Sequence, residues 1–313
     1  MVFPAFSPGG DTIRIMNDRE NQITPLGVGL VLLTAGAILA LVVWRATAPP
    51  PQLDSLTSIR ATGVVRIGYA NEAPYGYLDS RTGRITGEAP EIARIILRRL
   101  GAQQIEPVVA EFGALIPGLK ARRFDVIATG MYITPERARE IDFSNPSYAI
   151  GEAFLVARGN PRGLHSFENV AENAARIGVM GGSVEHGYAK AVGIPEERIV
   201  VFPDYPSALE GLRTGRIDAV AATDLTAEDL LRKANDPAIE RAEPFTNPVI
   251  DGRSVVGYGA FGFRKGDDLF REAFNEELEK FLGTEEHLEL VRPFGFSEAT
   301  LPGGVTAEKV ISK

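Results

Sequence analysis

An internal repeat limits the possible folds of this sequence more than any other feature. Residues 118–128 read GLKARRFDVIA and residues 211–221 read GLRTGRIDAVA, while Arg66-Ile67-Gly68 recurs as Arg176-Ile177-Gly178. A repeat of this length and degeneracy is unlike that of a solenoid. It predicts that the globule contains two similar α/β lobes.

From residue 63 onward, short apolar strands alternate with amphipathic helices, which is typical of α/β architecture. Residues 64–69 predict a strand, and residues 88–100 predict a helix with its isoleucines and leucines at helical spacing. A further predicted helix over residues 114–120 leads into a strand over residues 124–128.

Two extended stretches predict where the chain passes between the lobes. Residues 151–158 leave the first lobe, and residues 255–264 return to it. We therefore expect lobe one at residues 55–152 plus 258–313 and lobe two at residues 155–250. Two crossings form a two-stranded hinge, and α/β proteins commonly bind small ligands in a cleft of this kind.

The composition excludes several classes of function. A net charge of −8 and a pI near 5.2 argue against a nucleic-acid partner, because no basic stripe is present to neutralise phosphates. The absence of cysteine excludes disulfides, thiolate catalysis and cysteine metal sites. The three histidines, His165, His186 and His287, match no metal-binding spacing, so we expect neither a metal nor a cofactor.

An uncharged apolar stretch at residues 27–44 is at the length threshold for spanning a bilayer and is long for a signal-peptide core. Ala46-Thr47-Ala48 resembles a cleavage site, but Pro49 follows it directly. We expect an uncleaved membrane anchor, with a cleaved signal as the alternative and Met16 as an alternative start; either segment places the globule outside the cytoplasm. The expected order is a tail (1–24), the anchor or signal segment (25–45) and a linker (46–54).

One strand–loop–helix segment carries an arginine placed to bind a carboxylate. Residues 125–129 predict a buried strand, residues 130–132 a loop, and Thr134-Pro135 the start of a short helix, because threonine caps helices and proline suits their first turn. Arg137 then lies beside the carboxyl end of the strand, where a guanidinium suits a ligand carboxylate. A solvated arginine on the helix surface is the alternative.

Three loops after predicted lobe-one strands converge with Arg137 in this arrangement. They carry Glu72 with Tyr75, then Phe112, then Tyr132. A carboxylate and a guanidinium on opposite sides of a cleft fit a zwitterion, and aromatic faces attract a delocalised cation by about 0.5–2 kcal/mol each. The alternatives are core packing for the aromatic side chains and a solvated loop position for Glu72.

Lobe two offers Ser183 and Asp224 to the same cleft. Ser183 ends a Gly-Gly-Ser turn at a predicted helix start, where backbone N–H groups can hold an anion, although such turns also simply join a strand to a helix. Asp224 follows a predicted strand over residues 219–222 and suits a cationic ligand group, with an N-cap or turn position as the alternative.

The order of these features resembles the extracytoplasmic solute-binding proteins of polar amino-acid ABC transporters, over residues 55–300. The resemblance implies a two-lobed periplasmic-binding-protein fold of type II, capture of the ligand by lobe closure, and an ABC permease as partner. It also implies that Arg137 binds the ligand carboxylate with help from Ser183, and that Asp224 meets the ligand's amino group.

Four motifs resemble those of the ectoine- and hydroxyectoine-binding subgroup of that family. They are ANEAPY (70–75), TGEAPE (86–91), EFGALIPGL (111–119) and GMYITPER (130–137). The resemblance implies an aromatic cage of Tyr75, Phe112 and Tyr132, with Arg137 on the ligand carboxylate and Glu72 on its ring nitrogen. Ectoine, a carboxylate on a cyclic amidinium ring, fits these residues.

We therefore expect a binding protein and not an enzyme. A polar amino-acid-binding protein of the same family is one alternative. A cyclohexadienyl dehydratase-like enzyme on the same fold is another, with Glu72 as the acid, although the sequence offers no second acid or base with an evident role. A membrane-tethered sensor is the third, for which residues 1–24 are short as an output domain.

Overall fold

The structure is a computed structural model that describes residues 54–250 and 252–312. These residues belong to one compact unit, Leu53–Lys313. The predicted tail, the predicted anchor or signal segment, and all of the linker except Asp54 lie outside the described residues. Among the helices of the described ranges, none is both long enough and apolar enough to cross a membrane.

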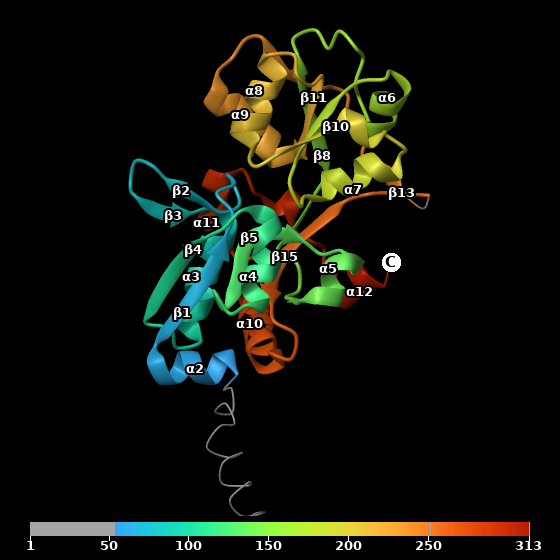
Figure 1. Cartoon of the computed structure of the whole chain (residues 1–313). Helices are drawn as coiled ribbons and strands as arrows, with labels where there is room; N and C mark the ends of the chain where they lie inside the picture. The colour runs from blue at the N-terminus through green and yellow to red at the C-terminus, as the bar shows by residue number, and fades with distance from the viewer. Residues whose placement is uncertain (1–53, 251, 313) are drawn as a thin grey trace, which may run out of the picture. The chain divides into compact units, whose positions relative to one another are not determined.

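Lobe one is built on a mixed sheet of order β4–β1–β5–β15–β6, with β7 also paired to β15 (Figure 1). Strands β4, β1 and β5 are parallel, whereas β15 is antiparallel to β5, β6 and β7. Its elements are α2 (Ser55–Thr62), β1 (Val64–Tyr69), β2 (Tyr77–Asp79), β3 (Arg84–Thr86), α3 (Glu88–Arg99), β4 (Gln104–Val109), η1 (Phe112–Ala114), α4 (Leu115–Lys120), β5 (Val126–Tyr132), α5 (Pro135–Glu140), β6 (Asp142–Phe143), β7 (Tyr148–Ile150), β15 (Gly257–Phe263), α10 (Asp268–Phe281), α11 (Glu285–Val291), η3 (Arg292–Phe294), η4 (Glu298–Thr300) and α12 (Ala307–Ile311).

Lobe two is built on a second sheet of order β10–β9–β11–β8–β12. Strands β10, β9 and β11 are parallel, and β8 is antiparallel to both β11 and β12. Its elements are β8 (Glu152–Ala157), α6 (Phe167–Glu172), β9 (Ile177–Met180), α7 (Val184–Ala191), η2 (Glu196–Arg198), β10 (Ile199–Phe202), α8 (Tyr205–Arg213), β11 (Ala219–Thr223), α9 (Asp224–Ala234) and β12 (Ile239–Arg241).

The chain changes sheets twice. It leaves the lobe-one sheet after β7 and enters the lobe-two sheet at β8, with only Gly151 between the two strands. It returns from β12 through the hairpin of β13 (Val249–Ile250) and β14 (Arg253–Ser254) to β15. The predicted two-lobed α/β fold is confirmed.

The sequence repeat corresponds to the same structural unit in each lobe. The first copy runs from α4 into β5, and the second runs from α8 into β11. In lobe one, the backbone N–H of Arg66 donates to Asp125 Oδ2 at 3.0 Å; in lobe two, the N–H of Arg176 donates to Asp218 Oδ2 at 2.7 Å. The repeated aspartate therefore ties the strand that follows it, β5 or β11, to the adjacent parallel strand of the same lobe, β1 or β9.

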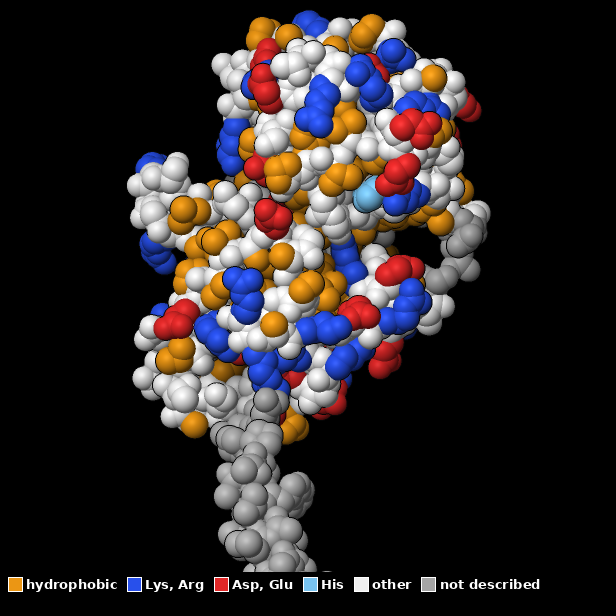
Figure 2. All heavy atoms as spheres, in the orientation of Figure 1, with side chains coloured by type: hydrophobic (Ala, Val, Ile, Leu, Met, Phe, Trp, Pro, Cys, Tyr) orange, Lys and Arg blue, Asp and Glu red, His pale blue; other side chains and the backbone are white. Residues whose placement is uncertain are grey.

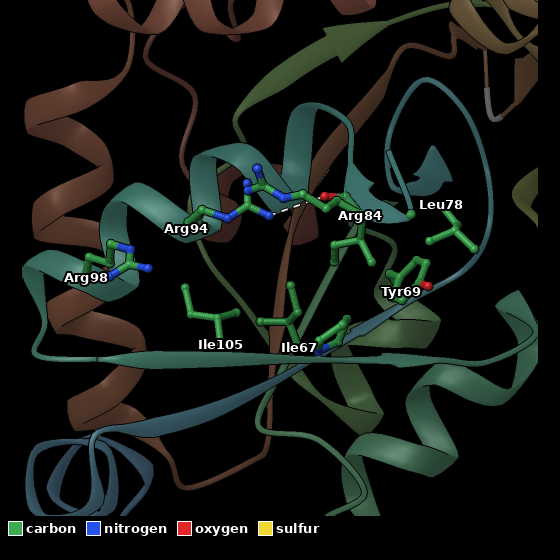
Figure 3. A pocket seen from close by; sticks show the side chains of 10 residues that line it. Ile67, Tyr69, Leu78, Arg84, Arg94, Arg98 and Ile105 are labelled. Carbon is green, nitrogen blue, oxygen red and sulfur yellow. Dashed lines mark hydrogen bonds between the residues drawn. The ribbon is translucent and has the colours of Figure 1, made fainter. Parts of the chain in front are cut away.

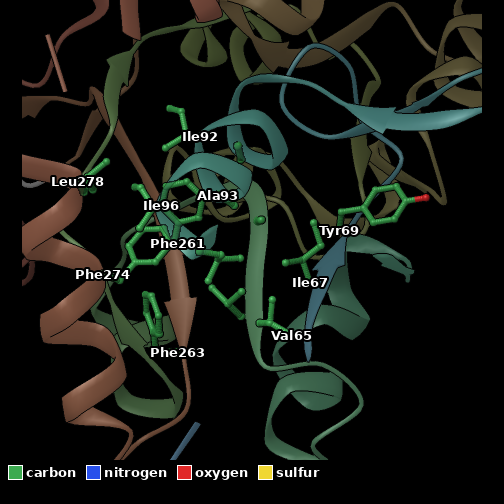
Figure 4. Close-up of a cluster of buried hydrophobic side chains, with 14 of the residues drawn as sticks. Val65, Ile67, Tyr69, Ile92, Ala93, Ile96, Phe261, Phe263, Phe274 and Leu278 are labelled. Atoms are coloured by element: carbon green, nitrogen blue, oxygen red, sulfur yellow. The ribbon is translucent and has the colours of Figure 1, made fainter. Parts of the chain in front are cut away.

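A buried aromatic and aliphatic core holds β15 in the lobe-one sheet (Figure 4). Phe261 and Phe263 of β15 pack on Phe274 of α10, with ring centroids 4.7 and 5.3 Å apart. Ile92 and Ile96 of α3 are buried in the same cluster. The strand that returns from lobe two is therefore fixed at its far end by phenylalanine side chains of this core.

The predicted loop at residues 130–132 is wrong, because β5 continues to Tyr132. Its pairing with β15 is irregular between Ala260 and Gly262, and Gly130 has a φ of +71°. A Cβ atom at Gly130 would lie 2.6 Å from both the Tyr75 ring and the Tyr148 hydroxyl. Glycine at this position allows the strand to kink and still pair, so Tyr132 is placed by a sheet and not by a loop.

Charged side chains of both signs are interspersed over the two lobes on the face shown in Figure 2. A surface of this kind differs from the single-sign basic surface that binds nucleic acid.

Candidate functional site

A pocket between the lobes brings together six of the seven residues predicted to form the site. Its lining residues are Glu72, Tyr75, Phe112, Gly130, Tyr132 and Arg137 from lobe one and Met180, Ser183, Val184, Glu185, Tyr205 and Thr223 from lobe two. The space between these side chains is about 20 Å³, close to the room that one water molecule needs. A solute of amino-acid size therefore requires the walls to separate.

A larger groove of about 400 Å³ adjoins this pocket. Glu72 and Phe112 of lobe one and Met180 and Tyr205 of lobe two line both spaces, so they separate the groove from the pocket. The pocket and the groove are therefore adjacent spaces divided by side chains of both lobes.

Direct hydrogen bonds between the lobes hold the pocket closed. The Tyr75 hydroxyl donates to Thr223 Oγ1 at 2.8 Å, and Thr226 Oγ1 donates to Glu72 Oε1 at 3.2 Å. Arg137 Nη2 donates to the Gly182 carbonyl oxygen at 3.0 Å. The structure therefore shows a closed arrangement of the two lobes, in which residues of the pocket themselves make the closing contacts.

Arg137 is positioned by the start of α5, as the sequence predicts. Thr134 Oγ1 accepts the backbone N–H of Arg137 at 3.2 Å, and Arg137 Nη1 donates to the Tyr132 carbonyl oxygen at 2.8 Å. The guanidinium lies 5.2 Å from the centre of the Phe112 ring. Burial lowers the pKa of Arg137, and the negative charge of the nearby Glu185 opposes this effect. The guanidinium nevertheless stays protonated at neutral pH.

Glu72 is a buried carboxyl on the lobe-one wall, between β1 and β2. Its backbone forms a bridge with Gly76, in which each N–H donates to the other's carbonyl oxygen at 2.9 Å. Burial, with a smaller contribution from the neighbouring Glu185 carboxyl, raises the pKa of Glu72 to about 8. A ligand cation would favour the ionised form of Glu72 and so bind to it strongly.

The aromatic walls are held by a buried residue that the sequence does not single out, Tyr148 on β7. Its ring stacks on Tyr75 with centroids 5.3 Å apart and an interplanar angle of 30°, and it lies 6.3 Å from the Tyr132 ring. Its hydroxyl donates to the Gly130 carbonyl oxygen at 2.7 Å. Tyr148 therefore fixes two walls of the pocket at the point where the chain crosses into lobe two.

The two residues predicted from lobe two have different positions. Ser183 precedes α7 and lines the pocket, and its buried Oγ has no hydrogen-bond partner in the part of the chain that the structure describes. Asp224 opens α9, is not among the lining residues, and forms an ion pair with Arg241. The preceding residue, Thr223, is the one that reaches the pocket and caps α9.

Glu185 and Tyr205 are pocket residues that the sequence reasoning did not identify. Glu185 lies in the first turn of α7, two positions after Ser183, and Tyr205 is the first residue of α8. The Gly-Gly-Ser turn could have indicated Glu185, because a side chain in the first turn of the helix that follows can also face the cleft. For Tyr205, the Asp-Tyr-Pro helix start marks the helix without showing which face is buried.

A separate recess of about 420 Å³ lies on lobe one alone (Figure 3). Arg84, Arg94 and Arg98 surround an apolar floor that includes Ile67 and Ile105. Arg94 is engaged by the Glu91 carboxylate and by the Ile85 carbonyl oxygen. The recess shares no residue with the pocket between the lobes, so it does not contribute to the predicted site.

The hinge strand β15 makes room for the aromatic wall through Gly257, which provides a test of this packing. A Cβ atom there would lie 1.8 Å from Cε2 of Tyr132. We expect Gly257→Ala to displace the Tyr132 ring and to lower the free energy of unfolding by roughly 1–3 kcal/mol. Denaturant unfolding measures this loss. Gly187→Ala is the matched control, since a Cβ at this helical position meets nothing within 4 Å, and equal effects of both variants would contradict the argument.

Comparisons with known proteins agree with this geometry. Over residues 65–296 the sequence matches the bacterial extracellular solute-binding proteins, family 3. It is 40% identical over 259 residues to a probable amino-acid ABC transporter periplasmic-binding protein of Sinorhizobium fredii, which covers 81% of this chain and 85% of that protein. It is 30% identical over 227 residues to the L-arginine-binding protein of Pseudomonas aeruginosa, which covers 72% and 85% of the two chains.

Solved structures show the same relationship. EhuB in complex with hydroxyectoine is 38% identical, with a TM-score of 0.75 over 82% of this chain and 98% of EhuB. An ancestral amino acid-binding protein, described as a precursor of cyclohexadienyl dehydratase, is 25% identical, with a TM-score of 0.67 over 77% and 99% of the chains.

The solute-binding relatives are components of ABC transporters and are not enzymes. Proteins of this kind bind polar, amino-acid-like ligands outside the cytoplasm. The predicted resemblance is confirmed: this chain belongs to the bacterial extracellular solute-binding proteins of family 3.

Proposed function

We propose that this chain captures a small zwitterionic solute of the ectoine and hydroxyectoine class and delivers it to an ABC permease. The observation that carries the proposal is the composition of the pocket between the lobes. The Arg137 guanidinium and the Glu72 carboxyl lie in a space walled by Tyr75, Phe112 and Tyr132. The ligand carboxylate would bind Arg137, its delocalised cation would lie against the aromatic faces, and a ring N–H would donate to Glu72.

The relatives support this class of ligand to different degrees. EhuB, which shares 38% of its residues with this chain, is described in complex with hydroxyectoine. The more distant Pseudomonas aeruginosa relative is described as binding L-arginine, so a polar amino acid is the second candidate ligand. The aromatic walls favour ectoine, because its cyclic amidinium is held rigidly, whereas arginine must order a flexible chain to place its guanidinium against the aromatic faces.

Closure couples binding to delivery. Arg137, Glu72 and Tyr75 of lobe one make the hydrogen bonds to lobe two that close the lobes, so a ligand held by these residues gains its own contacts with lobe two only in the closed state. The closed form is then the one that a permease recognises. The apolar stretch at residues 27–44 remains our proposed anchor or export signal for the globule.

A ligand panel on the full chain tests this function. We expect ectoine and hydroxyectoine to raise the unfolding temperature, since a ligand at about 100 times its Kd stabilises the folded state by about 2.7 kcal/mol. Glycine betaine, proline, glutamine, arginine and prephenate complete the panel, and titration calorimetry measures the affinities. Stabilisation by glutamine or arginine and not by ectoine would assign a polar amino acid instead. Turnover of prephenate would establish an enzyme.

A further inference from the structure

Carboxyl groups outnumber guanidinium groups around the pocket between the lobes. Glu72 and Glu185 line it together with a single guanidinium, Arg137. Directly at the hinge, Glu152 is also buried, and neither of its carboxyl oxygens has a hydrogen-bond partner in residues 54–250 and 252–312. A zwitterion whose carboxylate binds Arg137 and whose cation binds Glu72 leaves the carboxyl of Glu185 without a ligand partner.

Glu185 is built into the pocket and not onto the surface. Glu185 is 2% exposed, and its Oε1 accepts a hydrogen bond from the Tyr205 hydroxyl at 3.4 Å. Its other oxygen, Oε2, is buried with no hydrogen-bond partner of good geometry among the described residues, although the Ser183 hydroxyl and the Glu152 carboxyl neighbour this carboxyl. Leaving a buried carboxyl oxygen without a donor is unfavourable, so this atom is suited to a donor that arrives with the ligand.

Glu72 presents its carboxyl to the same pocket from lobe one, where Oε1 already accepts the Thr226 hydroxyl. Burial raises the pKa of both Glu72 and Glu185. A cation placed in the pocket would offset this desolvation and allow both carboxyls to ionise. One carboxyl from each lobe is therefore available to a single cationic group.

We propose that Glu185 is a second cation-binding carboxylate of this pocket, which selects solutes whose cationic group carries N–H donors on two edges. A cyclic amidinium has this form: one N–H donates to Glu72 and the other to Glu185, while the carboxylate binds Arg137. A quaternary ammonium has no N–H and leaves Glu185 without a donor. This inference rests on the proposed function and deepens it, because it states which cationic groups the site prefers.

Titration calorimetry with two probes tests the role of Glu185. Ectoine carries an amidinium with two N–H groups, and glycine betaine carries a quaternary ammonium with none. We expect Glu185→Gln to weaken ectoine binding at least tenfold and to change glycine betaine binding less than threefold, so that the preference for ectoine falls. Glu228→Gln is the control, since Glu228 is an exposed carboxylate on α9 in the same lobe, and it should leave the preference unchanged.

The outcome separates this inference from the proposed function. If wild-type protein does not bind ectoine, or binds it equally well after Arg137→Ala, the proposed function itself is wrong. If ectoine binding depends on Arg137 but the ratio of the two affinities is the same in Glu185→Gln and wild type, the role of Glu185 is wrong. If the glutamine variant does not fold, Glu185→Asp replaces it in the test. This variant keeps the charge but shortens the side chain, so it should lower the ratio of ectoine affinity to glycine betaine affinity.

Discussion

Arg137→Ala is expected to abolish ligand binding at the concentrations where the wild-type protein is saturated. The guanidinium is the only cationic side chain among the residues that line the pocket between the described lobes. Without it, the ligand carboxylate would enter a closed space with no charged partner. Truncating one member of a buried, hydrogen-bonded charge pair costs about 2–5 kcal/mol, which corresponds to a loss of affinity of about 30-fold to several thousand-fold.

Arg137→Lys separates charge from geometry in the same experiment. Lysine keeps a positive charge but lacks the planar fork that donates to Tyr132 and Gly182 carbonyl oxygens in the closed structure. We expect an affinity between those of the wild type and the alanine variant. Titration calorimetry gives the affinities, and circular dichroism shows whether each variant is folded.

Arg139→Ala is the matched control for this prediction. Arg139 lies two residues away on α5, its side chain is 71% exposed, and its ion pair is with Glu136 at 3.8 Å. Removing it should leave binding unchanged, because exposed ion pairs contribute little. Wild-type affinity in Arg137→Ala, or an equal loss in Arg139→Ala, would show that Arg137 is not the carboxylate-binding residue.

The fold is predictable from the sequence because its signals are local and repeated. The strand expected at residues 64–69 is β1, and the repeat correctly places α4–β5 and α8–β11 as equivalent units. Each copy carries an aspartate that accepts a backbone N–H at the adjacent parallel strand, from Arg66 in β1 or from Arg176 directly before β9, which is a physical reason for the repeat to persist in both. Periodicity therefore defines the elements and their order.

The details of the pocket depend on contacts that sequence patterns do not contain. Gly130 reads as a loop residue, yet a kink in β5 lets the strand continue, because β15 supplies a partner from far along the chain. Asp224 follows a strand as expected, but Arg241 on the neighbouring β12 pairs with it instead. Glu185 becomes visible only when α7 is packed against β9 and α8.

The unfolding free energy of the ligand-free protein is expected to fall between about pH 4.5 and pH 8, with Glu88 as one cause. Glu88 opens α3, is 1% exposed, and does not line the pocket between the lobes. Neither of its carboxyl oxygens has a hydrogen-bond partner of good geometry in the described ranges. Burial raises the pKa of Glu88 from 4.5 to about 8, against a smaller opposing effect of Ser147.

The sign of this dependence follows from proton binding. Between the two pKa values the folded state holds the Glu88 proton and the unfolded state has lost it, so the folded state binds more protons and stability decreases as pH rises. The contribution is fully present below pH 4.5 and is lost as pH passes the folded-state value of about 8. A shift of this size corresponds to a change on the order of 3–5 kcal/mol.

Glu88→Gln should remove this part of the pH dependence. Glutamine has nearly the shape of the protonated carboxyl and does not ionise, so any cost of burying its amide is the same at every pH. The readout is therefore the difference in unfolding free energy between pH 5 and pH 8.5, measured by denaturant unfolding without ligand. Some dependence should remain in the variant, because burial also raises the pKa of Glu72 to about 8.

Glu289→Gln is the control for Glu88→Gln, since Glu289 is an exposed glutamate on α11 of the same lobe. Its pH dependence should match that of the wild type. A Glu88→Gln curve parallel to the wild-type curve would mean that the Glu88 carboxyl is already ionised in the folded protein. In that case a cation or a set of donors must reach Glu88 in solution, and α3 would have to begin with a solvated first turn instead of the buried one seen in the structure.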